Sequence, residues 1–216
     1  MIKKNTYHRV LSSIIVTPIV LFLIIIGNIL FTFFLIFCFI ISFLEWKNMT
    51  YKKVYFFPGL IFLIYSYYTA YHLRILSIDG LFLFLFVLVI TIASDLGGYI
   101  FGNIFKGPKL GKISPKKTYS GVIGSYFLSI IATYIYIFFY KSIFNNNAIL
   151  EFNYITVLII STVSQAGDLT ISFFKRKSNI KDTGNLIPGH GGILDRTDGI
   201  IFALPFFYFF LNYFLQ

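Results

Sequence analysis

Long apolar blocks constrain this chain more than any other feature of its sequence. The blocks are about 16 to 25 residues long, the length that a helix needs to cross a hydrocarbon core about 30 Å thick. We therefore expect an all-α, polytopic integral membrane protein with about seven transmembrane helices. The predicted spans are Val10–Ile26, Ile29–Leu44, Val54–Tyr71, Leu81–Phe105, Val122–Tyr140, Tyr154–Phe174 and Ile200–Leu215.

The composition excludes an ordinary soluble domain. Only 12% of the 216 residues are charged and 57% are apolar, whereas globular proteins carry about 25% charged residues. The single cysteine, Cys38, has no second cysteine with which to form an intrachain disulfide. We expect the first apolar block to be retained rather than cleaved as a signal peptide, because no small-x-small cleavage pattern follows it.

The positions of the basic residues indicate an orientation in the membrane. The net charge of +10 would also suit a nucleic-acid partner, but 16 of the 18 Lys and Arg residues fall on one side if the seven spans alternate in direction. Only Arg74 and Lys141 fall on the other side. Because basic residues concentrate in cytoplasmic loops, we predict a cytoplasmic N-terminus and no nucleic-acid partner.

Glycine and polar residues are distributed unevenly along the chain. Only three of the 16 Gly residues precede Gly97, and the first three spans are almost entirely Phe, Ile and Leu. We therefore predict an N-terminal transmembrane scaffold over residues 1–80 and a catalytic transmembrane region over residues 81–216. Cytoplasmic loops at residues 106–121 and 175–199 belong to the second region.

Two carboxylates, Asp95 and Asp168, lie inside predicted spans, where a charge is costly and normally faces a protein interior or a wet cavity. Polar helix–helix contacts are the alternative role for them, and small-residue packing is the favoured role for Gly98 and Gly102. Helical spacing places further polar residues on the face of Asp168. These are Ser161, Gln165, Ser172 and then Lys175 or Arg176.

The two cytoplasmic loops carry the residues best suited to phosphate chemistry. Asp195 and Asp198 are three residues apart, so on a helix they share one face, as two carboxylates bridged by Mg²⁺ would. Glycines in the same loop allow successive N–H groups to point at an anion. Loop 106–121 has five lysines, for which binding of anionic lipid is an equal alternative. The glycines are Gly189, Gly191 and Gly192, and the cations beside them are Lys175, Arg176, Lys181 and Arg196.

The second loop also resembles a known signature. The pattern S-x-x-K-R-x4-K-D-x-G-x2-[LI]-P-x-H-G-G-x-x-D-R-x-D, from Ser172 to Asp198, is similar to that of the phosphatidate cytidylyltransferases, or CDP-diacylglycerol synthases. Three shorter stretches also resemble that family: Ala93–Gly102, Ser114–Thr118 and Gly167–Leu169. The chain departs from the family at Leu96, Ser120 and Ile171, which leaves secondary contacts and substrate preference open.

This resemblance implies transfer of CMP from CTP to phosphatidic acid, giving CDP-diacylglycerol and pyrophosphate, at the cytoplasmic face of a bacterial inner membrane. It implies a Mg²⁺ cofactor, as two divalent ions or one divalent with one monovalent ion, and a lipid bilayer and both substrates as partners; a homodimer stays open. The implied metal ligands are Asp168, Asp195, Asp198 and Asp95. The other implied catalytic residues are Lys175, Arg176, Lys181, Asp182, His190 and Arg196. The implied substrate-binding residues are Ser114, Lys116, Lys117, Thr118, Ser172, Gly189, Gly191 and Gly192.

Some alternatives remain at this stage. His190 could bind phosphate, order its loop or transfer a proton. An ion or solute transporter would explain Asp95 and Asp168 but would leave the glycine-rich loop without a role. A CDP-alcohol phosphotransferase is a further alternative, but the sequence pattern typical of those enzymes is absent, and only Asp195–Gly199 faintly resembles part of it. A catalytically inactive relative is the least favoured alternative.

Overall fold

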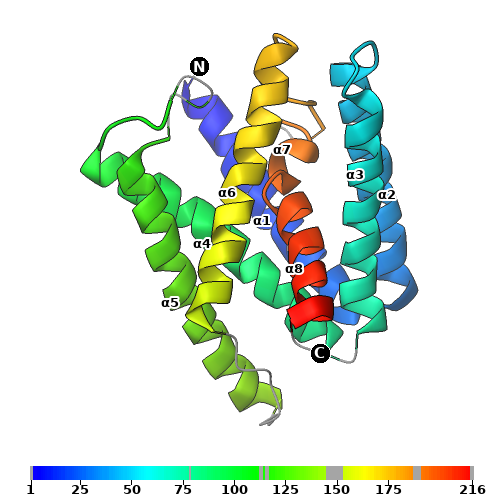
Figure 1. The fold of residues 1–216 in the computed structure, drawn as a ribbon, viewed down its shortest axis with the longest axis vertical. Helices are drawn as coiled ribbons and strands as arrows, with labels where there is room; N and C mark the ends of the chain where they lie inside the picture. The colour runs from blue at the N-terminus through cyan, green and yellow to red at the C-terminus, as the bar shows by residue number, and fades with distance from the viewer. Residues whose placement is uncertain are drawn as a thin grey trace.

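The computed structural model describes residues 2–77, 79–111, 114, 117–144, 153–186 and 191–214, without the side chains of residues 2–13, 144 and 214. Within this part the chain is helical, apart from connecting segments and one isolated β-bridge between Lys109 and Thr118. The helices, shown in Figure 1, are α1 (Ile2–Ile26), α2 (Asn28–Thr50), α3 (Phe56–Tyr71), the π-helical turn η1 (His72–Leu76), α4 (Gly80–Phe105), α5 (Tyr119–Phe144), α6 (Tyr154–Lys177), α7 (Leu194–Thr197) and α8 (Ile200–Phe214).

Each predicted span coincides with a helix of the structure, which confirms the all-α fold class. Four helices, α2, α4, α5 and α6, are long and apolar enough to cross a membrane. Shorter apolar helices cover Ile14–Ile26 and Ile200–Tyr213. Two helices extend well past their predicted spans. The first, α1, begins at Ile2 rather than Val10. The second, α2, runs on to Thr50, past the predicted end at Leu44, because the residues that follow keep packing on α3 and α6.

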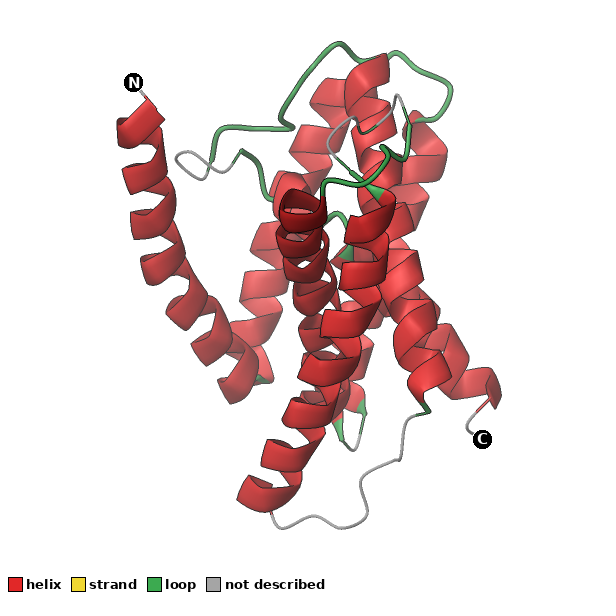
Figure 2. Ribbon diagram, turned by 90° about the vertical axis from the view of Figure 1, so that its left-hand side faces the viewer, coloured by secondary structure: helices red, strands yellow, loops and turns green. Residues whose placement is uncertain are grey.

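Successive long helices run in alternating directions. The start of α1, the α2–α3 connection, the segment after α4 and the end of α6 lie at one end of the molecule, drawn at the top of Figure 1. Most basic residues belong to these segments. In Figure 2 the beginning of α1 diverges from the other helices, whereas its end meets them. The alternation that the charge pattern requires is therefore present in the fold.

The apolar core joins the helices on both sides of residue 80. One buried cluster includes Phe31 of α2, Phe86 of α4, Ile160 of α6 and Phe207 of α8. A second, smaller cluster centres on the buried Trp46 of α2 and combines residues of α2, α3, α6, α7 and α8. The predicted scaffold helices thus share their cores with the predicted catalytic helices.

Arg74 caps the C-terminal end of α1, at the opposite end of the molecule. The last carbonyls of a helix lack partners within it, and here Arg74 donates from Nε to the Ile24 carbonyl at 2.7 Å and from Nη2 to the Ile25 carbonyl at 2.9 Å. The chain then turns at Gly27, which has a φ of +67°. This positive φ favours glycine, and a Cβ at Gly27 would also lie 2.6 Å from Arg74 Nη2 and displace the guanidinium.

Small residues allow α4 and α5 to cross in close contact. A Cβ on Gly98 would lie 3.0 Å from Ser125 Oγ, and one on Gly102 would lie 3.1 Å from Thr118 Oγ1. Ser125 Oγ donates to the Ser94 carbonyl across the crossing at 2.6 Å. The predicted small-residue contact is therefore confirmed, and it sets the position of Asp95 relative to α5.

We predict that Gly124→Val destabilises the protein by about 2 kcal/mol or more, the cost of overpacking a closely packed contact. A Cβ at Gly124 would lie 2.8 Å from the Gly97 carbonyl oxygen, so α4 and α5 would have to separate. The thermal unfolding midpoint in detergent micelles measures this. Ile123→Val, at a side chain that is 68% exposed on the same helix, is the control, and equal midpoints for the two variants would contradict the prediction.

Candidate active site

A cavity of about 310 Å³ lies between α4, α5, α6 and the α7 region. Four of its lining residues are aspartates, each brought by a different part of the chain: Asp95 from α4, Asp168 from α6, Asp195 from α7 and Asp198 from the turn after α7. The other described lining residues are Ser94, Gly98, Tyr99, Leu110, Lys117, Thr118, Gly121, Val122, Ser125 and Gln165. The fold thus gathers the four predicted metal ligands around one space.

Lys117 neutralises Asp168. Its Nζ lies 2.6 Å from Asp168 Oδ2, and both side chains are 27% exposed. The same ammonium donates to the Gln165 carbonyl at 3.4 Å, one turn earlier on α6. Ser172 Oγ donates to Asp168 Oδ1 at 3.3 Å. The segment before α5 is thereby joined to the middle of α6, as sequence alone did not show.

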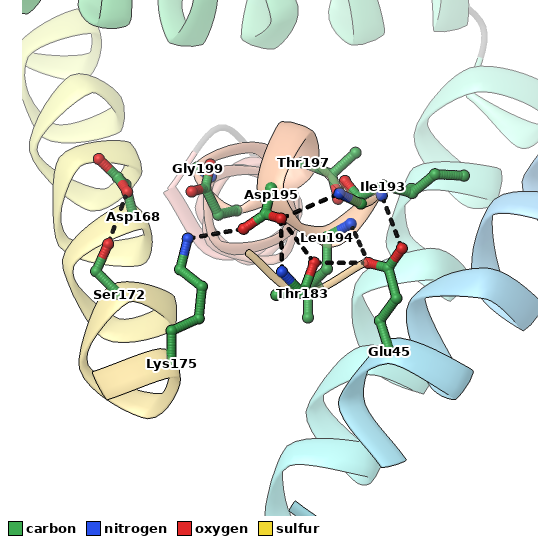
Figure 3. A network of polar contacts seen from close by, with 12 residues as sticks. Glu45, Asp168, Ser172, Lys175, Thr183, Ile193, Leu194, Asp195, Thr197 and Gly199 are labelled. Carbon is green, nitrogen blue, oxygen red and sulfur yellow. Dashed lines mark hydrogen bonds and ion pairs between the residues drawn. The ribbon is translucent and has the colours of Figure 1, made fainter. Parts of the chain in front are cut away.

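A second lysine neutralises Asp195 (Figure 3). Lys175 Nζ lies 2.7 Å from Asp195 Oδ1, with the two side chains only 13% and 6% exposed. The other oxygen, Oδ2, accepts from the backbone N–H of Thr183 at 2.7 Å and from that of Gly192 at 3.1 Å, and the Thr183 hydroxyl oxygen lies 3.0 Å away. This carboxylate is therefore fixed on both of its oxygens.

These contacts determine the charge of Asp195. Burial would raise the pKa of its carboxyl, but the Lys175 ammonium and the backbone N–H groups of Gly192 and Thr183 outweigh burial and lower the pKa below its ordinary value. Asp195 is therefore an anion at neutral pH. Gly191, with a φ of +86°, belongs to the same turn, and a Cβ there would lie 2.7 Å from Asp195 Oδ2.

Asp198 is a buried residue where the turn after α7 meets α6. It accepts from the Gly199 N–H at 2.9 Å. Burial first, and the facing Asp168 carboxylate second, raise the pKa of Asp198 well above its ordinary value. Gly167 permits this approach, because a Cβ there would lie 2.7 Å from the Asp198 carbonyl oxygen. Close packing thus explains why a glycine precedes Asp168 in the sequence.

The donor set of this cavity suits a hard divalent cation. Mg²⁺ prefers carboxylate oxygens, and facing carboxylates such as Asp168 and Asp198 repel each other unless a proton or a cation lies between them. Within the described part of the chain, however, no three Asp, Glu, His or Cys side chains are already arranged as a metal-binding group. Lys117 and Lys175 hold two of the four aspartates instead.

The remaining predicted site residues fall into three groups. Thr118 lines the cavity and also caps α5, because its hydroxyl accepts from the Gly121 N–H at 3.1 Å. Arg176, Lys181, Asp182 and Arg196 are exposed, and Ser114 is partly buried; none of them is among the described lining residues. Lys116, Gly189 and His190 lie outside the described residues.

Sequence reasoning missed Glu45 and Thr183. Glu45 is a buried carboxylate near the end of α2, and Thr183 connects it to Asp195 (Figure 3). Asp95 and Asp168 were singled out because a carboxylate inside an apolar segment is costly, and the same argument applies to Glu45. Because Glu45 lies close to Lys47 in the sequence, however, it resembled the polar end of a span. Thr183 stands at an unspecified position of the signature and gave no signal.

Comparison with known proteins agrees with this site. A model described as the cytidylyltransferase family matches residues 64–214. The chain is similar to the phosphatidate cytidylyltransferase of Rickettsia felis, with 37% identity over 96% of this chain and 92% of that protein. It is 36% identical to that of Rickettsia prowazekii over 95% and 92% of the two chains, and 44% identical to that of Haemophilus influenzae over 61% and 46%. The chain therefore belongs to the cytidylyltransferase family, together with the bacterial phosphatidate cytidylyltransferases that it resembles along most of its length.

Proposed function

We propose that this protein transfers the cytidylyl group of CTP to phosphatidic acid, releasing pyrophosphate and forming CDP-diacylglycerol. The observation that carries this function is the meeting of four aspartates and Lys117 in one cavity, with Lys175 paired to one of the aspartates. Family membership and the names of the relatives that cover almost the whole chain support the same reaction.

In the reaction, a phosphate oxygen of phosphatidic acid forms a bond to the α-phosphorus of CTP. The bond from that phosphorus to the bridging oxygen of the β-phosphate breaks, and pyrophosphate leaves with the electron pair. The nucleophile is already anionic, so the protein must bring two polyanions together and stabilise the charge that develops on the leaving group. Cations placed around a carboxylate-lined cavity suit both tasks.

The two ion pairs suggest how the site changes partners. Lys117 and Lys175 satisfy Asp168 and Asp195 in the structure described here. Phosphate oxygens compete for the same ammonium groups, and each lysine that turns to a phosphate leaves a carboxylate available to a cation. Asp168, Asp195 and Asp198, with Asp95, would hold Mg²⁺, which when bound neutralises negative charge on the triphosphate.

The fold also suggests a placement in the membrane. We propose seven spans in the inner membrane of a bacterium, with the N-terminus and the cavity on the cytoplasmic side. The cavity lies toward the end of the molecule that carries most of the basic residues, and such residues concentrate in cytoplasmic loops. CTP would then enter from the cytoplasm, while the acyl chains of phosphatidic acid stay in the bilayer.

An ion path through Asp95 and Asp168 is the alternative function, but it would leave the hydrogen-bonded turn around Asp195 without a role.

A direct assay tests the reaction and its acidic residues. Purified protein incubated with radiolabelled CTP, phosphatidic acid and Mg²⁺ should transfer label to the organic phase. Asp168→Asn and Asp195→Asn, which keep shape and remove charge, should each lower the rate by about 10²-fold or more, the scale for loss of a central electrostatic stabiliser. Asp79→Asn, outside the cavity at the start of α4, is the matched control. Unlabelled lipid from the unaltered protein would refute the function.

The lysines should behave as phosphate-binding groups rather than as lipid anchors. Lys117→Gln and Lys175→Gln should each lower the rate at saturating substrates by at least about 10-fold, because only contacts that strengthen toward the transition state affect that rate. Lys109→Gln, at an exposed lysine that does not line the cavity, should have a small effect. Kinetics in micelles with and without a non-substrate anionic lipid distinguish the two roles. Rescue of Lys175→Gln by that lipid would favour a membrane anchor.

Labelling of single cysteines tests the orientation. In a Cys38→Ala background, cysteines at Lys109 and Lys177 should be protected from a membrane-impermeant thiol reagent in intact cells. Ser142→Cys, near the end of α5 at the opposite pole, should react. Permeabilised cells, in which all three exposed sites should react, provide the control. Labelling of Lys177→Cys in intact cells would place the cavity on the outer side and contradict cytoplasmic entry of CTP.

A further inference from the structure

Glu45 occupies an unusual position for a residue of the predicted scaffold. Its side chain, 6% exposed, leaves α2 and ends among groups of the loop between α6 and α7 (Figure 3). Its oxygens accept three hydrogen bonds: Oε1 from the Ile193 N–H at 3.0 Å, and Oε2 from the Leu194 N–H at 2.8 Å and from the Thr183 hydroxyl at 2.8 Å. It forms no ion pair among the described residues. A buried carboxylate is tolerated only when its hydrogen bonds are satisfied in this way.

Two glycines of the signature make room for this carboxylate. A Cβ at Gly184 would lie 2.6 Å from Glu45 Oε1, and a Cβ at Gly192 would collide with all three atoms of the same carboxylate group. These glycines stand on the two flanks of the loop, Thr183–Gly184 and Gly191–Leu194. Both loop flanks are thus shaped around one side chain of α2.

The same loop flanks fix Asp195. The backbone N–H groups of Thr183 and Gly192 both donate to Asp195 Oδ2. The Thr183 hydroxyl has a single hydrogen and lies within hydrogen-bond distance of both Glu45 and Asp195. A continuous series of contacts therefore runs from Glu45 through Thr183 to Asp195 and on to Lys175.

The end of α2 is itself firmly placed. The Trp46 ring packs edge-on against Phe174 of α6 with centroids 5.2 Å apart, and its indole N–H donates to the Phe56 carbonyl at 3.0 Å. Ser178, just after α6, donates from its hydroxyl to the Met49 carbonyl at 2.8 Å. The helix that carries Glu45 is thus fixed against the helix that carries Asp168 and Lys175.

We propose that Glu45 is a positioning residue of the active site, which holds the two loop flanks so that Asp195 faces the cavity. This role rests on the proposed function for its effect on the rate, but not for its effect on the loop. Glu45 touches neither substrate in this proposal and acts through Thr183 and the backbone of residues 192–194. It also lies outside the part of the chain that the family model matches.

The test uses three variants of the full chain and one matched control. Glu45→Gln turns an acceptor into an amide donor that faces N–H or hydroxyl groups, and Thr183→Val removes the shared hydroxyl without changing shape. Thr183→Ser retains the hydroxyl and should restore the unaltered behaviour. Thr50→Val, at a buried threonine of α2 whose hydroxyl donates to the Trp46 carbonyl, controls for loss of a buried hydroxyl as such.

Two readouts separate the loop from the reaction. In micelles without substrate, trypsin should cleave after the exposed Lys181 faster in Glu45→Gln and Thr183→Val than in the unaltered protein or Thr50→Val. The same two variants should lose about 10-fold or more in kcat, the scale for a catalytic group misplaced by a fraction of an ångström, and should need more Mg²⁺ for half-maximal rate. In an Asp195→Asn background, Glu45→Gln should cause little further loss, because the two changes act on one group.

The outcomes are distinct. Unchanged cleavage after Lys181 in Glu45→Gln, or a full further loss in the Asp195→Asn background, would overturn the positioning role. Faster cleavage with unaltered kcat and Mg²⁺ dependence would also overturn it. An unaltered protein that transfers no cytidylyl group would refute the proposed function alone, because cleavage reports on the loop directly.

Discussion

Carboxylates removed from bulk water impose the constraint on which this structure depends. Four of them, at Glu45, Asp168, Asp195 and Asp198, are buried or partly buried and lie in or next to one cavity. Each must find hydrogen bonds or a cation, since an unsatisfied buried charge costs several kcal/mol. The positions of Lys117, Lys175, Thr183 and the backbone N–H groups around them follow from this need. The conformation of the loop between α6 and α7 thus supplies the hydrogen-bond partners that these carboxylates require.

The two lysine–aspartate pairs connect this requirement to chemistry. An ion pair that is largely removed from solvent is a modest contributor to stability, because desolvation offsets much of its attraction. Such a pair is easily exchanged when a polyanion offers the lysine another partner and leaves the aspartate to a cation. A site in which lysines pair with two of four aspartates, and can exchange those partners for phosphates, suits an enzyme that must accept two negatively charged substrates. The same exchange explains why two of the predicted metal ligands, Asp168 and Asp195, are paired with ammonium groups in this structure.

Glycines position the elements that carry the charged groups. Gly98, Gly102 and Gly124 bring α4 against α5, and Gly167 lets the turn after α7 approach α6 beside Asp168. Gly184 and Gly192 surround the carboxylate of Glu45. A methyl group would crowd a hydroxyl oxygen at Gly98 and Gly102, and a backbone or carboxylate oxygen at the other four glycines. The glycines of the second half of the chain therefore serve close packing at the site as much as backbone flexibility.

Local pattern determined much of this protein. Apolar run length fixed where the helices lie, because a helix must satisfy its own backbone in an apolar medium, and helical spacing placed Ser172 and Lys175 on the face of Asp168. Their position inside predicted spans identified Asp95 and Asp168, and the signature identified Asp195 and Asp198. Tertiary structure alone decided which lysine pairs with which aspartate, that Thr118 caps α5, and that α2 contributes Glu45 to the loop. Glu45 and Thr183 are 138 residues apart. Helical periodicity specifies which face of a helix is polar, but which helices become neighbours depends on how all of their surfaces pack together.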